Sequence, residues 1–134
     1  MTSNGTDWKL GEVRGKCETI SCEAAGSIAA GDFVSINGFN DDGQPKIITQ
    51  ATTAVPIGVA MYKASTGDFV QIVIRGFVKV TFGDAVAQGG PIYVHGNAVW
   101  LGTKSGAVQM GGWNHGPMRA DQDTGIIFLS GGTS

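Results

Sequence analysis

The chain has 134 residues, of which 22 are glycine, with 42% hydrophobic residues, 15% charged residues and a formal net charge of −2. This composition excludes a disordered chain. The sequence contains no run of about 18 apolar residues, so no membrane-spanning helix is predicted. Lysine and arginine are scattered singly, without the basic stripe that binds phosphates, so neither nucleic acid nor a membrane is expected as a partner. The length fits one domain, and residues 1–16 lack a signal-peptide core, which predicts a protein made in a cytoplasm.

The first 15 residues form a polar segment without a clean period. It contains one large anchor group, "WKL", formed by Trp8, Lys9 and Leu10. A terminal segment of this kind is usually mobile unless a partner holds it. Two interpretations stay open for residues 1–15: a frayed terminus, or an arm that orders on a partner through the anchor group.

From Lys16 to the last residue, at position 134, apolar residues recur with period two. The runs include "DFVSIN", "PKIIT", "IGVAMY", "FVQIVIR", "FVKVTF", "PIYVH" and "IIFL", and each is bounded by Gly, Asn, Asp or Pro. Short strands at this spacing predict an all-β body over residues 16–134, an antiparallel barrel or sandwich. The dipeptide Asp42-Gly43 in "NDDG" predicts a tight hairpin.

Two cysteines, Cys17 and Cys22, fit neither the common zinc spacing nor the Cys-x-x-Cys redox motif. On one strand their Cα atoms would lie about 16 Å apart, too far for a disulfide without an intervening turn. We expect two reduced, half-buried thiols.

One phrase occurs twice in the chain. "SIAAGDFVSING" is echoed by "DAVAQGGPIYVHGN", with Gly31 aligned to Gly89, and "PIGVA" is echoed by "QMGGW", 53 residues further on. Likewise "TGDFVQIVIRG" is echoed by the shorter "TGIIFLSG". These echoes predict two similar halves, at about residues 24–76 and 84–131. The alternative is chance likeness between glycine-rich β segments.

Motifs for chemistry are missing. There is no nucleophile elbow and no phosphate loop, and an EF-hand aligned on "NDDG" would place Thr49 at the bidentate glutamate position. We therefore expect no catalytic residue, no metal and no cofactor. The one acid–base arrangement left open pairs His115 with Asp121 or Asp123.

The stretch Gly111–Gly125, "GGWNHGPMRADQDTG", is the longest part of the C-terminal half without strand character. Long loops in compact domains tend to carry function, and Trp, Met and Arg are enriched at protein interfaces. The candidate interface residues here are Trp113, Asn114, His115, Met118 and Arg119. Two alternatives remain: Trp113 plugs one end of a barrel, or it binds a ligand. A carbohydrate would use Trp113, Trp100 or Tyr93 as a stacking platform.

The order of these elements resembles a known family. "SIAAGDFVSI", "VPIGVAMYKASTGDFVQIVIRGFVKV", "AVAQGGPIYV" and "GIIFLSG" are similar to the cement, or head-decoration, proteins of tailed bacteriophages, over about residues 24–131. The second copy departs from the pattern, since Gly90 stands in place of Asp, and Gly112 with Trp113 replaces Val-Ala.

The resemblance implies a structural virion protein rather than an enzyme. It implies a small β-barrel or β-tulip-like body, with an N-terminal arm that adds a strand to the major capsid (coat) protein. It also implies a homo-oligomer, with a trimer favoured over a dimer, on the outer surface of an assembled capsid that it stabilises by bridging coat subunits. The alternative is a carbohydrate- or protein-binding β-module displayed on a larger assembly.

Overall fold

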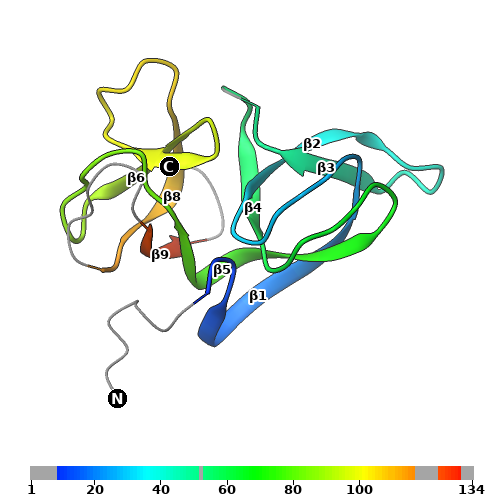
Figure 1. Cartoon of the computed structure of the whole chain (residues 1–134), viewed down its shortest axis with the longest axis horizontal. Helices are drawn as coiled ribbons and strands as arrows, with labels where there is room; N and C mark the ends of the chain where they lie inside the picture. The colour runs from blue at the N-terminus through cyan, green and yellow to red at the C-terminus, as the bar shows by residue number, and fades with distance from the viewer. Residues whose placement is uncertain (1–8, 52, 117–123, 131–134) are drawn as a thin grey trace.

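The computed structural model describes residues 9–51, 53–116 and 124–130 (Figure 1). Within these residues every regular element is a strand, so the expected all-β class is confirmed. The nine strands are β1 (Val13–Ala24), β2 (Phe33–Phe39), β3 (Pro45–Thr49), β4 (Pro56–Ala60), β5 (Phe69–Thr81), β6 (Pro91–His95), β7 (Ala98–Trp100), β8 (Val108–Asn114) and β9 (Thr124–Ser130).

The first five strands pair in a ring, in the order β1–β3–β2–β4–β5 and back to β1. The β1–β5 pair is antiparallel, with Thr19 opposite Val73. The β1–β3 pair is parallel, with Glu23 opposite Lys46. The sheet is therefore mixed, and the expectation of a purely antiparallel body is wrong at this pair. The reason is geometric: the chain reverses once between β1 and β2 and again between β2 and β3, so β3 runs in the direction of β1.

The remaining strands continue from β5 in the order β9–β8–β6–β7. A single parallel bridge between Phe82 and Val99 brings β7 back to the end of β5. In Figure 1 the two sets of strands form two lobes, and β5 passes from one to the other. This strand is thirteen residues long, which lets it serve both sets.

The same strand order therefore occurs twice: β3–β2–β4–β5 in the first set and β7–β6–β8–β9 in the second. Equivalent backbone hydrogen bonds also occur in both sets of strands. Ala25 N–H donates to Ile47 O at 2.7 Å, and Gly83 N–H donates to Val99 O at 2.8 Å. Gly31 N–H donates to Ala60 O, as Gly89 N–H donates to the main-chain oxygen at position 114.

The pairing registers of β4 with β5 and of β8 with β9 correct one detail of the repeat seen in the sequence. Val59 of β4 lies opposite Val73, while Trp113 of β8 lies opposite Phe128. Position 59 thus corresponds to position 113, one residue later than the echo of "PIGVA" in "QMGGW" predicts. Two adjacent glycines in β8 hid the shift, because either can be aligned with the single glycine of β4.

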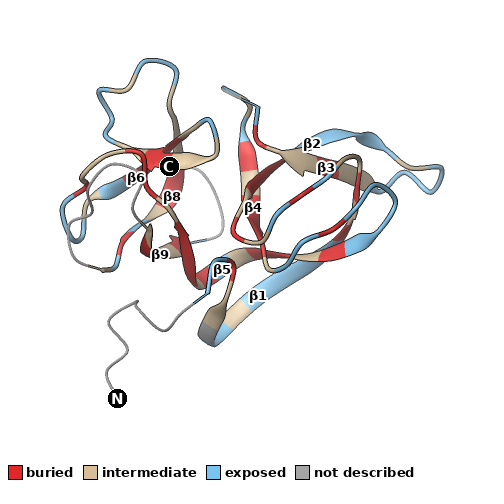
Figure 2. Cartoon of the chain, viewed as in Figure 1, coloured by how far each residue is buried: buried red, intermediate tan, exposed pale blue. Residues whose placement is uncertain are grey.

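Hydrophobic residues gather in two buried clusters. One fills the first ring and includes Cys22, Val34, Ile47 and Ile72. The other lies in the second lobe and extends to Phe33, Val59 and Val73 from the first five strands. Figure 2 shows buried residues along β5 where it passes between the lobes. The two lobes therefore share a core.

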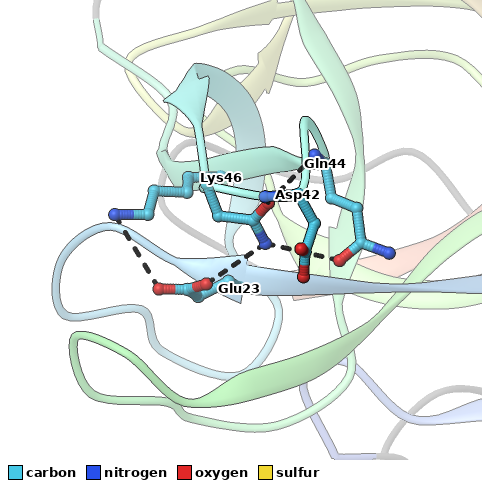
Figure 3. Close-up of polar contacts among 5 residues, drawn as sticks. Glu23, Asp42, Gln44 and Lys46 are labelled. Atoms are coloured by element: carbon cyan, nitrogen blue, oxygen red, sulfur yellow. Dashed lines mark hydrogen bonds and ion pairs between the residues drawn. The ribbon is translucent and has the colours of Figure 1, made fainter.

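The expected hairpin at Asp42-Gly43 is confirmed. The Asn40 side-chain oxygen accepts hydrogen bonds from the N–H of Asp42 at 2.9 Å and of Gln44 at 3.0 Å, which holds the turn. Gly43 adopts φ 79°, a conformation that glycine reaches without strain. Behind the turn, Lys46 Nζ lies 3.8 Å from a carboxylate oxygen of Glu23 (Figure 3).

A polar bridge joins the two lobes. The Asp32 carboxylate accepts hydrogen bonds from Thr49 Oγ1 at 2.6 Å and from Asn97 Nδ2 at 2.8 Å. In turn Asn97 Oδ1 accepts the N–H of Phe33 at 2.7 Å, and Gln50 Oε1 accepts the N–H of Asn97 at 2.8 Å. The tip of the β6–β7 hairpin is thereby fastened to the start of β2.

Candidate partner-binding surfaces

The expected arm begins to pack on the body before its expected boundary at residue 15. Gly11 N–H donates to Lys79 O at 3.0 Å, and Gly11 lies so close to Ala60 O that a Cβ there would have no room. Strand β1 begins at Val13, opposite Val78. Residues 9–15 therefore belong to the folded body.

Of the anchor group, Lys9 and Leu10 are exposed, and Trp8 lies outside the described residues. Leu10 rests on Gly31, where its Cβ lies only 2.8 Å from the place a Cβ would take. An open groove of about 710 Å³ runs beside it. The groove is lined by Lys9, Leu10, Gly11, Glu12, Val13, Ala30, Met61 and Tyr62. An apolar surface is thus available at the root of the arm.

The expected interface loop is partly strand. Strand β8 runs through Trp113 and Asn114, so these two residues stand on a sheet and not in a loop. Asn114 is fully buried, and its Nδ2 donates to Val86 O at 2.7 Å and to Ala87 O at 3.3 Å. It holds the turn before β6, and its buried side chain cannot contact a partner directly. Met118 and Arg119 lie outside the described residues.

Trp113 is 40% exposed and begins a row of four rings, three on the neighbouring strands β8, β9 and β5 and one on His115, just after β8. It stacks on Phe128 of β9, with ring centroids 4.4 Å apart. Phe128 contacts Phe77 of β5 at 4.9 Å, and Phe77 contacts the ring of His115 at 4.5 Å. We call Phe77, Trp113, His115 and Phe128 the aromatic row.

Sequence reasoning found only Trp113 and His115 of this row. The signal for Phe77 and Phe128 was present, because each alternates with residues of a buried face. Val78 and Ile127 point into the core, so their neighbours Phe77 and Phe128 must point to the opposite side. What period two cannot supply is the pairing of β5 with β9, which makes the two rings neighbours.

Each stacking platform of the carbohydrate alternative already has a neighbour against its ring. Gly83 lies directly beneath the Trp100 ring, and Lys104 Nζ lies 4.3 Å from the ring centroid. The Tyr93 ring packs on Gly102, and the Trp113 ring stacks on Phe128. The carbohydrate alternative stays a prediction for these three residues.

The acid–base alternative stays a prediction. His115 is exposed, and its Nδ1 accepts a long hydrogen bond of 3.4 Å from Trp113 Nε1. Asp121 and Asp123 lie outside the described residues. Across the described ranges no three His, Cys, Asp or Glu side chains are placed to hold a metal ion.

The cysteines are both free, as expected, but the expectation that both are half-buried is wrong for Cys22, because its side chain points into the first ring. Cys17 is half-buried, while Cys22 lies in the core of the first ring, where burial raises the pKa of its thiol. The part of the chain that the structure describes contains no helix long and apolar enough to cross a membrane.

Comparison with known proteins agrees with this architecture. A family model described as phage cement protein matches residues 13–126. The structure is similar to "the crystal structure of head fiber gp8.5 N base in bacteriophage phi29", with a TM-score of 0.58. That match covers 89% of this chain and 98% of the other at 14% identity, which supports a shared fold. No curated protein matches the sequence.

Proposed function

Because the chain belongs to the phage cement protein family, which is structural and not enzymatic, we propose that it binds the outer surface of an assembled capsid. In this role it stabilises the shell by bridging neighbouring coat subunits. A protein that binds only the assembled state favours that state by mass action, and needs no catalytic group to do so.

One observation supports this role above the others: the described residues form at least two separate apolar surfaces. The first is the groove at the root of the arm, beside Leu10. The second is the aromatic row on β5, β8 and β9. A bridging protein must hold at least two partners at once, either two coat subunits or one coat subunit and a second copy of itself. Aromatic rings are the groups that most often anchor such contacts.

The proposal also covers the type of barrel, the coat-binding residues and the oligomeric state. The closed strand order β1–β3–β2–β4–β5 supports a small barrel of the β-tulip kind. We assign coat binding to Trp8, Lys9 and Leu10, since Lys9 and Leu10 line the groove and the whole group precedes a strand that a coat segment could extend. We also assign a homo-oligomer, because closed symmetry is the usual outcome for identical chains. We place a trimer before a dimer on the resemblance to cement proteins alone. We assign no contact with nucleic acid.

Co-sedimentation with coat shells of the same phage that lack this protein tests the proposal. The sharp variant removes residues 1–8 and leaves Gly11 and β1 in place. We expect it to lose at least tenfold in shell affinity while its β-sheet circular dichroism is unchanged. The matched control removes residues 1–5, keeps Trp8, and should bind as the full chain does. Full occupancy by the variant lacking residues 1–8 would show the arm assignment to be wrong.

A further inference from the structure

The aromatic row has a counterpart in the first half of the chain. Val59 and Val73 lie opposite each other on β4 and β5. Trp113 and Phe128 lie opposite each other on β8 and β9. Since β8 and β9 take the places of β4 and β5 in the repeated strand order, the two pairs occupy the same site on the same face.

In the first half this site is completely covered. Val59 and Val73 are both fully buried, and they belong to the same cluster as Ile92 and Leu129 of the second half. The residues that follow them on β4 and β5 point the other way: Ala60 and Ile72 belong to the cluster inside the first ring. The valine pair thus lies on the outer face of the first ring, where strands of the second half cover it.

In the second half the site is open. Trp113 keeps 40% of its surface, and His115 at the end of the row is exposed. The neighbouring positions on the inner face are filled as in the first half, since position 114 and Ile127 are buried. The outer face therefore differs in one way: large rings stand where the first half has covered valines. Large rings gain most from being removed from water.

We propose that the aromatic row is the contact between copies of this protein, so that a second copy covers Trp113 and Phe128 as the second half covers Val59 and Val73. The proposal rests on the homo-oligomer of the proposed function and names its surface. A second copy is the occupant because the protein's own fold shows what covers this face: another β unit of the same kind. A dimer lets two rows meet each other, whereas a ring of three requires each row to meet a different surface of its neighbour.

Light-scattering mass measurement over a hundredfold range of concentration tests this assignment. The test variant is Trp113→Lys, which places a charge at the exposed ring with which the row begins. A second variant, His115→Glu, changes an exposed residue at its end and leaves the stacked rings in place. The matched control is Phe39→Lys, because Phe39 is 65% exposed on a hairpin of the other half. Circular dichroism checks that each variant is folded.

We expect the wild type and Phe39→Lys to form the same oligomer. Trp113→Lys should sediment and scatter as a single chain of 13.8 kDa, and His115→Glu should shift dissociation to at least tenfold higher concentration. A monomeric wild type, or a Trp113→Lys variant with the wild-type mass, overturns the inference. If shell binding is lost in Trp113→Lys while its mass is unchanged, the row contacts the coat instead. If the wild type forms the oligomer but binds no shell, the proposed function fails and the self-contact stands.

Discussion

The two halves of the chain follow one strand order but are closed differently. In the first half β1 and β3 share two parallel residue pairs, Glu23 with Lys46 and Ala24 with Ile47. In the second half the corresponding closure is the single bridge between Phe82 and Val99. The first half is completed within itself, while the second takes part of its core from the outer face of the first. The same strand order thus has its outer face covered in the first half and exposed in the second half.

The halves also differ at the start of their second strand. Asp32 in the first half bonds Thr49 and Asn97, and the position that corresponds to it is Gly90. An aspartate at position 90 would serve no equivalent bridge, because no described hairpin reaches that turn as the Asn97 hairpin reaches Asp32. A Cβ at Gly90 would also lie only 2.9 Å from Ala87 O, so this turn favours glycine for a steric reason.

The largest effect is expected at the glycines that let the last two strands of each half approach closely. A Cβ on Gly112 would overlap Phe128 O, and one on Gly58 would overlap Val73 O. We expect Gly112→Ala to lower the free energy of unfolding by about 3 kcal/mol, because its φ of 134° adds strain to the overlap. Gly58→Ala should cost about 2 kcal/mol.

Urea unfolding measures both changes. The control is Gly89→Ala, which also has a positive φ but open space around it, and should cost about 1 kcal/mol. If Gly112→Ala costs no more than Gly89→Ala, then β8 and β9 do not approach as described.

Removing the polar bridge between the halves should lower the free energy of unfolding by an intermediate amount. Asp32→Ala removes the acceptor of Thr49 and Asn97 and should cost about 2 kcal/mol. Asp68→Ala is the matched control, since Asp68 stands in a second "GDFV" phrase. Its carboxylate accepts the N–H of Ser65, as that of Asp32 accepts the N–H of Ala29, but among the described residues it has no partner in the other half. Its loss should cost about 1 kcal/mol. Equal losses in thermal or urea unfolding would show that the bridge adds nothing between the halves.

The smallest effect concerns pH. Burial raises the pKa of the Cys22 thiol, so the folded state holds this proton more tightly than the unfolded state. The resulting stability is present below the ordinary thiol pKa of about 8.5 and is lost as the pH rises through the raised pKa. Unfolding followed from pH 7 to 10 should show an alkaline loss in the wild type and in Cys17→Ala, and a smaller one in Cys22→Ala. An identical loss in Cys22→Ala would assign the effect to other groups.

Much of the fold can be predicted from the sequence, since alternation in "FVKVTF" correctly places Val78, Val80 and Phe82 on one buried face. The parallel β1–β3 pair cannot, because local pattern says nothing about which distant strands meet. The site is harder still. Asparagine is a residue type that is mostly exposed, and the hydrogen bonds from Asn114 Nδ2 to the carbonyl groups of Val86 and Ala87, which help to explain its burial, come from pairings that the sequence does not reveal.

This protein is proposed to stabilise an assembled capsid, and the dissociation temperature of undecorated coat shells tests that role most directly. Shells heated with a saturating amount of the full chain should come apart at a higher temperature than bare shells. The shift should disappear when residues 1–8 are removed. Bare and treated shells that dissociate at the same temperature, with the protein bound, would contradict the claim.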